Sequence, residues 1–238
     1  PVYRLPELSV QMLADQLNRY GGIRKFNGEE LWLGSPLVVH RRCIDPMFRI
    51  SNEVAYNGRM FSETEPPNLS QHFLFESSVW LDCKGAENGN KDHAVRKQVQ
   101  LAAHLLEQGI DVYGGFPDIY IITPFTSVER ALKKAFRLVI RRKLPQANTQ
   151  DVTDWIQENC GTIHTFQGKE AAEVLLVLGC DAQSGRGAAH WVGQKPNIIN
   201  VAVSRAKFRL AVIGDYDLWK CIPYVQTVCK YLTQKEPT

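Results

Sequence analysis

The chain has 238 residues, of which 44% are hydrophobic and 22% are charged, and its formal net charge at pH 7 is +3. This composition excludes a mostly disordered chain and a collagen-like chain, and the length allows one large domain or two small ones. The longest apolar run, from Val174 to Leu178, is far shorter than the ~18 residues of a membrane-spanning helix, so we expect no membrane partner.

Alternating strand and helix patterns run through the whole chain. In the first half of the chain, we predict a helix over 9–20, a strand over 37–40, a helix over 46–57, strand-like pieces over 72–83 and a helix over 92–108. The middle is predicted to contain a strand over 118–124, helices over 127–142 and 152–159, and strands over 161–166 and 174–179. A helix over 198–206, a strand over 210–214 and a helix over 223–231 complete the prediction. Because several strands are continuously apolar, we predict an α/β fold with a parallel sheet covered by helices on both faces. The polar, glycine-rich stretch 183–197 is predicted to be a loop.

The six cysteines, at positions 43, 83, 160, 180, 221 and 229, include no CxxC pair and no Cys/His cluster with zinc spacing. We therefore predict no metal site and expect free thiols in a reducing, cytoplasmic compartment. The sequence starts at Pro1 without an initiator Met and without a signal region, which is typical of a fragment of a longer protein.

In parallel α/β sheets ligands bind beyond the carboxyl ends of the strands, and several polar segments follow predicted strands here. The densest is 162–170, where Gly168 allows backbone N–H groups to approach a phosphate or ribose and Glu170 can accept from a ribose hydroxyl. Along an extended strand, Thr162 and His164 point to the same side. The alternative interpretation of this segment is a polar turn with a capping glutamate.

Arginines supply two further candidate sites. Arg205 lies in a helical pattern in which Asn200, Ser204 and Lys207 share one face, and its guanidinium matches the geometry of phosphate oxygens. Arg41 and Arg42 follow the short strand at 37–40, and at most one of them faces a strand-end crevice. For each of these arginines the alternative is an ordinary solvated surface position.

The predicted helix 127–142 is strongly basic. The stretch 129–143 contains seven Lys and Arg against one acid, and the following cations form one stripe: Arg130, Lys133, Lys134, Arg137 and Arg141. Such a stripe can contact nucleic-acid phosphates, or it can be the solvated face of an ordinary amphipathic helix.

Absent motifs narrow the function. The one Gly-Lys pair, Gly168-Lys169, has Ile163 where a G-x-x-x-x-G-K-[ST] phosphate loop needs glycine. Asp82 and Asp181 end apolar strands without a second acid beside them, so we interpret both as strand-end caps. The chain therefore has no complete nucleotide-hydrolysis site of its own.

Taken together, the segments 162–170 and 200–207 resemble motifs V and VI of superfamily 1 helicases, in particular the bacterial relatives of the nonsense-mediated-decay RNA helicase. Residues 123–125 resemble the Thr-Pro-Tyr segment of that group, and residues 40–46 and 52–58 resemble motif IV and the helix after it. The resemblance covers about residues 36–215. It implies a RecA-like α/β fold and identifies the chain as the second, C-terminal motor domain.

The resemblance implies one C-terminal RecA-like domain over 1–238, with a lead-in at 1–35, a motif-bearing core at 36–215 and a C-terminal helix at 216–238. The missing phosphate loop and magnesium-binding acids would belong to a first RecA-like domain of the same parent protein, which is the expected partner. ATP with Mg²⁺ is the expected cofactor. The expected nucleic-acid partner, along which the motor would move, is single-stranded DNA rather than RNA.

The resemblance to the helicase motifs assigns roles to individual residues at matching positions. Arg205 resembles the arginine finger, and Arg42 resembles the motif IV arginine; both face the γ-phosphate of ATP. Gln167, Gly168 and Glu170 match nucleotide-binding positions.

On the nucleic-acid side, Thr123, Pro124, Thr162 and His164 match positions that contact the backbone of the track. An isolated second motor domain would show almost no ATP hydrolysis without the domain that carries the phosphate loop.

The chain departs from the family pattern in two places. Motif IV reads His40-Arg41-Arg42 in place of Gln-Tyr-Arg, and the proline follows Arg42 by four residues where the family has three. The sequence therefore leaves the choice between Arg41 and Arg42 open, and Arg42 is taken as the candidate. The Asn-x-x-Glu-Ala pattern before the long helix reads Asn90 to Ala94, with His93 at the glutamate position.

Two rival functions remain: a non-catalytic nucleic-acid-binding or regulatory module with a helicase-derived fold, and an unrelated nucleotide-binding α/β enzyme. The presence of both Arg205 and Glu170 argues against the unrelated enzyme.

Overall fold

A computed structural model describes residues 17–18, 21–26, 29–34, 38–68, 70–89, 92–166 and 168–237. The chain divides into two compact units, residues 1–39 and residues 40–238. Apart from residues 17–18, the helix predicted over 9–20 lies outside the described residues. The first unit contains an antiparallel pair that the sequence analysis missed, β1 (Gly22–Phe26) and β2 (Glu29–Leu33).

The second unit is built on a six-stranded sheet in which every neighbouring pair is parallel, in the order β10-β5-β9-β8-β6-β7. Its strands are β5 (Val79–Asp82), β6 (Ile119–Thr123), β7 (Cys160–Thr162), β8 (Ala171–Val177), β9 (Ala206–Gly214) and β10 (Thr233–Lys235). All seven residues of β8 are buried, as expected for a central strand covered on both faces. Two short strands, β3 (Val39–His40) and β4 (Phe61–Ser62), pair outside this sheet.

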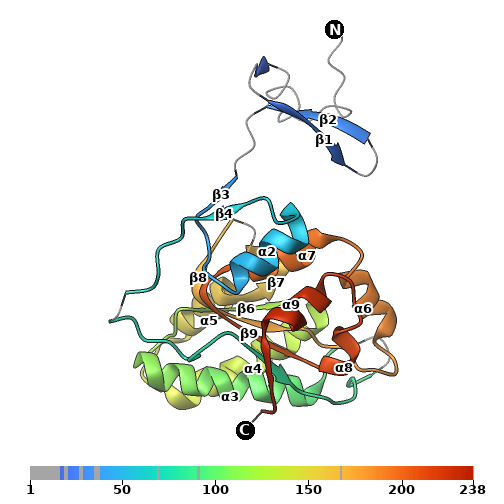
Figure 1. Cartoon of the computed structure of the whole chain (residues 1–238). Helices are drawn as coiled ribbons and strands as arrows, with labels where there is room; N and C mark the ends of the chain where they lie inside the picture. The colour runs from blue at the N-terminus through green and yellow to red at the C-terminus, as the bar shows by residue number, and fades with distance from the viewer. Residues whose placement is uncertain are drawn as a thin grey trace. The chain divides into compact units, whose positions relative to one another are not determined.

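Helices cover both faces of the sheet (Figure 1). One face carries α3 (Arg96–Tyr113), α4 (Thr126–Lys143) and α5 (Thr149–Asn159), which pack on one another and on β6 to β9. The other carries α2 (Met47–Tyr56), α7 (Pro196–Val203) and α9 (Val225–Tyr231). Short helices α6 (Arg186–Val192) and α8 (Tyr216–Trp219) contact each other. The arrangement confirms the predicted α/β class.

Four predicted elements were wrong in part. The strand predicted over 161–166 ends at Thr162 and continues as a 3₁₀ helix, η1 (Ile163–Phe166), because its partner β6 stops at Thr123 before a proline. Thr162 and His164 therefore do not lie on one strand, and the prediction that alternation along a strand points both side chains to the same side is wrong. The stretch 183–197, predicted as a loop, contains α6.

The helix predicted over 198–206 ends at Val203, and Ala206 already pairs with Ala171 at the start of β9. Lys207 therefore lies on a strand and does not share a helix face with Asn200. Of the strand-like pieces predicted over 72–83, only Val79–Asp82 forms a strand. The exposed, polar β10 was missed because an edge strand of three residues has no apolar pattern.

A buried carboxylate connects the sheet to the segments around it. Glu173, on β8, is fully buried; one of its carboxylate oxygens accepts from the backbone N–H of Phe75, and the other accepts from the N–H of Leu74 and the hydroxyl of Tyr113. Burial raises the pKa of Glu173 despite these bonds. The side chain thus fixes the segment before β5 and the end of α3 to the central strand.

Replacing Glu173 with alanine is expected to lower the free energy of unfolding by about 2–4 kcal/mol, because three donors lose their acceptor inside the protein. Chemical denaturation measures this loss. Tyr113→Phe, which removes one of the three bonds, is expected to cost about 1 kcal/mol.

The pH dependence gives an independent check on Glu173. Folding raises the pKa of Glu173 above its ordinary value of 4.5. Its contribution to the free energy of unfolding is therefore complete below pH 4.5 and declines as the pH rises toward the pKa of the folded state. The wild-type protein should therefore lose stability relative to Glu173→Gln as the pH increases from 4.5. A constant difference between the two proteins over that range would contradict this assignment.

Candidate functional site

Two of the predicted nucleotide-binding residues meet at the amino ends of the central strands. Glu170 directly precedes β8 and Arg205 directly precedes β9, and the N–H of Ala171 donates to the carbonyl of Arg205 over 3.0 Å. Glu170 was expected beyond the carboxyl end of a strand, and the structure places it at the amino end of β8 instead.

Backbone carbonyls hold the Arg205 guanidinium in place. Its side chain is buried, with Nε donating to the carbonyl of Val201 at 3.1 Å. Nη1 donates to the carbonyls of Phe166 (3.2 Å) and Lys169 (2.7 Å), whereas Nη2 makes only a long contact of 3.4 Å with the hydroxyl of Ser204. Carbonyls orient the guanidinium without neutralising its charge, and Nη2 keeps the greatest capacity to donate to an anion.

The adjacent arginines 41 and 42 differ in their partners. Arg41 forms a 2.7 Å ion pair with Glu63, whereas Arg42 is exposed and forms no ion pair with any residue in the described part of the chain. The N–H of Ile44 donates to the carbonyl of Lys207 at 3.1 Å, which brings this segment alongside the start of β9. Burial and then the charge of Arg42 lower the pKa of Arg205. The positive charge of Arg42 therefore acts on the Arg205 guanidinium.

A buried histidine shapes the turn that carries Arg42. His40 Nε2 accepts from the N–H of Cys43 at 3.2 Å, and its ring lies 5.3 Å from that of Phe48. Burial and the positive charge of Arg42 lower the pKa of His40, so the ring stays neutral and keeps its acceptor nitrogen.

The rest of the predicted nucleotide-binding segment lies beside this cluster. Glu170 is exposed, and its negative charge opposes the other effects on the pKa of Arg205. Gly168 has φ +89°, a left-handed conformation that favours glycine over other residues, as predicted for a tight turn. Gln167 lies outside the described residues.

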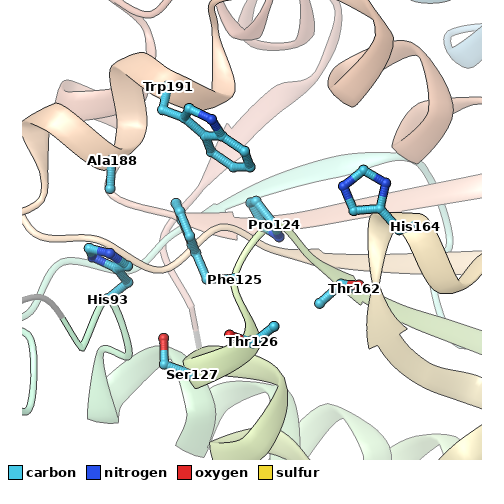
Figure 2. A pocket seen from close by; sticks show the side chains of 9 residues that line it. All are labelled: His93, Pro124, Phe125, Thr126, Ser127, Thr162, His164, Ala188 and Trp191. Atoms are coloured by element: carbon cyan, nitrogen blue, oxygen red, sulfur yellow. The ribbon is translucent and has the colours of Figure 1, made fainter.

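An open cavity of 610 Å³ lies at the carboxyl ends of β6 and β7 (Figure 2). Three of the four residues predicted to contact nucleic acid line it: Pro124, Thr162 and His164. The fourth, Thr123, is fully buried, and its hydroxyl accepts from the N–H of Phe125 at 3.4 Å. Thr123 therefore shapes the turn into α4 and does not reach the cavity.

Aromatic rings form the opposite wall of this cavity (Figure 2). The ring of Phe125 lies 4.7 Å from that of His93 and 6.1 Å from that of Trp191, which is 44% exposed. The sequence analysis missed His93 and Trp191. Two sequence features could have indicated them: Trp191 is a lone tryptophan in a polar stretch, and His93 stands where the family pattern has glutamate.

The basic helix α4 is partly neutralised by neighbouring acids. Lys133 pairs with Glu129 at 2.7 Å, and the helices α3 and α4 are joined by the pairs Arg142–Glu107 (2.7 Å) and Lys143–Asp111 (2.6 Å). The remaining cations of the predicted stripe are exposed: Arg130, Lys134, Arg137 and Arg141. The stripe on α4 therefore has four exposed cations, fewer than the five that the sequence indicates.

Both aspartates interpreted as caps have that role. Asp82 accepts from the N–H of Tyr216, and Asp181 accepts from the N–H groups of Gln183 and Ser184. Although burial alone would raise the pKa of Asp181, its hydrogen bonds lower it to about 2. The cysteines are free, and five of the six are buried.

The family model described as an AAA domain matches residues 34–217, and the chain belongs to this family. The family occurs in superfamily 1 helicases, and together with the parallel sheet it defines a helicase-like NTPase domain of RecA-like fold. No curated protein matches the chain. Within the described residues, no helix has both the length and the hydropathy to span a membrane.

Arg205→Ala is expected to lower the free energy of unfolding by about 2–4 kcal/mol, because the carbonyls of Val201, Phe166 and Lys169 lose their shared donor. Chemical denaturation of the chain measures the loss. Arg42→Ala, on the exposed arginine beside it, is expected to stay within about 0.5 kcal/mol of the wild type. Equal stability of Arg205→Ala and the wild type would contradict the structural role of the guanidinium.

Proposed function

We propose that this chain is the second, C-terminal RecA-like motor domain of a superfamily 1 helicase or translocase of the group related to the nonsense-mediated-decay RNA helicase. In this proposal the domain supplies half of an ATP hydrolysis site and half of a track for single-stranded nucleic acid. The observation that carries the proposal is the buried guanidinium of Arg205 directly before β9, which backbone carbonyls orient without an acidic partner and on which the charge of the exposed Arg42 acts.

Two guanidinium groups near each other repel one another, so their placement fits a site that receives an anion. Phosphoryl transfer depends mostly on positioning and on stabilising the charge that develops on the transferred group. We assign Arg205 as the arginine finger, with Arg42 as a second contact to the γ-phosphate. Gln167, Gly168 and Glu170 would contact the nucleotide, with Glu170 close to the ribose.

The first RecA-like domain of the parent protein would supply the remaining half. The sequence has no phosphate loop, and Glu170 is the one carboxylate that acts on the pKa of Arg205. These residues fit the phosphate end of ATP but do not fit a Mg²⁺ site. Mg²⁺, which neutralises phosphate charge when bound, would therefore be held by the first domain.

The cavity at the carboxyl ends of β6 and β7 fits single-stranded nucleic acid. Thr162 and His164 offer polar contacts to the backbone, and the exposed ring of Trp191 offers a surface on which a base can stack. Stacking and backbone contacts need no 2′-hydroxyl, so we expect DNA to bind at least as tightly as RNA.

In a longer protein that includes the phosphate-loop domain, Arg42→Gln is expected to lower kcat for nucleic-acid-stimulated ATP hydrolysis by about 10³-fold while ATP still binds, because one γ-phosphate contact is lost. Steady-state hydrolysis and nucleotide-binding assays measure the two effects. The matched control is Arg41→Gln, which removes the neighbouring arginine that pairs with Glu63 and should leave kcat unchanged.

Equal effects of the two substitutions would contradict the assignment of Arg42. A wild-type protein that binds nucleic acid but hydrolyses no ATP would favour the alternative, a non-catalytic nucleic-acid-binding or regulatory module.

For the chain alone, Trp191→Ala is expected to raise the Kd for a labelled single-stranded oligonucleotide by about 5- to 100-fold, because one stacked base loses about 1–3 kcal/mol. The slope of log Kd against log salt should not change, since no phosphate contact is removed. Fluorescence anisotropy with matched DNA and RNA measures both quantities.

Phe61→Ala provides the control, because Phe61 is an exposed aromatic residue on β4 outside the cavity, even more exposed (68%) than Trp191 (44%). If Phe61→Ala weakened binding as much as Trp191→Ala, the cavity would not be the binding site.

A further inference from the structure

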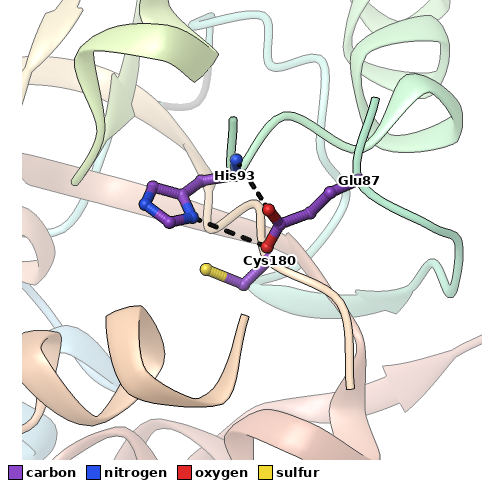
Figure 3. Close-up of side chains that lie close together, drawn as sticks. All are labelled: Glu87, His93 and Cys180. Atoms are coloured by element: carbon purple, nitrogen blue, oxygen red, sulfur yellow. Dashed lines mark hydrogen bonds and ion pairs between the residues drawn. The ribbon is translucent and has the colours of Figure 1, made fainter. Parts of the chain in front are cut away.

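A histidine, a glutamate and a cysteine converge beneath the aromatic wall of the cavity (Figure 3). Glu87 follows β5, His93 precedes α3 and Cys180 follows β8. Their potential ligand atoms, a carboxylate oxygen, Nδ1 and Sγ, all lie within 4.8 Å of one another. We propose that Glu87, His93 and Cys180 form a binding site for one Zn²⁺ ion, which shares His93 with the wall of the proposed nucleic-acid cavity.

The separation of the first two ligand atoms fits a shared metal better than a hydrogen bond. Oε1 of Glu87 lies 3.5 Å from Nδ1 of His93. A good hydrogen bond would bring these atoms to about 2.7–3.2 Å. Two ligands on a tetrahedral zinc, at metal distances of about 2.1 Å, are about 3.4 Å apart. A sulfur ligand needs a slightly larger separation, about 3.6 Å, and Sγ of Cys180 lies within 4.8 Å of both other atoms.

The same two atoms are buried without partners. Oε1 of Glu87 and Nδ1 of His93 have no hydrogen-bond partner among the described residues, and the Glu87 side chain is only 2% exposed. An unpaired buried carboxylate oxygen costs several kcal/mol, so it needs a compensating cation. A zinc ion between the two atoms and the thiolate of Cys180 would satisfy all three.

Hydrogen bonds outside the coordination positions hold the ligands in place. Oε2 of Glu87 accepts from the N–H of His93 at 3.0 Å, and the carbonyl of His93 accepts from the N–H of Cys180 at 2.8 Å. Asp181 accepts from the N–H of Glu87 at 2.9 Å and uses its other oxygen at Ser184, so it orients the site and is not a ligand.

The backbone leaves little free volume around these ligands. A Cβ on Gly185 would lie 2.6 Å from Cβ of Cys180 and 2.7 Å from Oε1 of Glu87. The segment that starts α6 therefore closes over the ligands only because residue 185 is glycine.

The ligand set selects the ion. Imidazole and thiolate favour Zn²⁺ over Mg²⁺ or Ca²⁺, which prefer oxygen ligands. The carboxylate and thiolate together balance the charge of the ion, and a water molecule can complete a tetrahedral site with three protein ligands. The ion would join Glu87 and His93, which are six residues apart, to Cys180, which lies far from both in the sequence.

The test uses the full 238-residue chain, first stripped of metal and then titrated with Co²⁺ as a spectroscopic probe and with Zn²⁺ in competition. We expect one equivalent of metal, tetrahedral Co²⁺ bands and a thiolate-to-cobalt charge-transfer band. Zinc at about 100 times its Kd should raise Tm by about 5–10 °C. X-ray absorption on the wild-type zinc form should show one sulfur neighbour with nitrogen and oxygen neighbours.

His93→Gln and Cys180→Ser should each weaken Zn²⁺ binding by about 100-fold or more, since even indirect partners of a metal are worth 10- to 100-fold. The matched controls His104→Gln and Cys221→Ser, on an exposed histidine and the exposed cysteine, should bind as the wild type does. Absence of stoichiometric binding, a sulfur-free absorption spectrum, or equal binding by His93→Gln would overturn the proposal and leave a His93–Glu87 ion pair.

Discussion

The buried guanidinium of Arg205 is the contact on which both candidate sites depend. It joins the end of α7 to the segment after β7 through the carbonyls of Val201, Phe166 and Lys169. No carboxylate takes part, so the arginine is oriented while its full charge remains available. An acidic partner in place of these carbonyls would hold the side chain as firmly but would cancel the charge that an anion site needs.

The segment 163–170 connects the two ends of the sheet through this contact. At one end His164 lines the cavity at the carboxyl ends of β6 and β7, and at the other Glu170 lies beside Arg205 at the amino end of β8. Between them Phe166 packs against Tyr120 on β6, with ring centres 4.6 Å apart. A displacement of Arg205 toward a phosphate would therefore change the bonds that hold the segment lining the cavity. In the proposed function, this contact would couple a nucleotide at one end of the sheet to nucleic acid at the other.

Local patterns predicted what depends on neighbouring residues in the chain. The strand Ile119–Thr123 was recognised from a continuous apolar run stopped by a proline, and α4 was recognised from its helical periodicity. The choice between Arg41 and Arg42 could not be made from sequence alone, because the ion pair with Glu63 forms across residues far apart in the chain. Likewise, spacing rules for zinc sites look for ligands in short runs, whereas Glu87, His93 and Cys180 come from three separate segments.

Charge placement separates the candidate site from the rest of the surface. On α4, Lys133, Arg142 and Lys143 all lie against acids, which lowers their repulsion. Arg42 instead forms no ion pair within the described residues, and burial first and then the charge of Arg42 lower the pKa of Arg205. The folded domain tolerates this repulsion because the carbonyls around Arg205 solvate it. A bound polyphosphate would remove the repulsion and add charge-assisted hydrogen bonds. The arrangement of positive charges therefore destabilises the free domain but stabilises the domain with an anion bound.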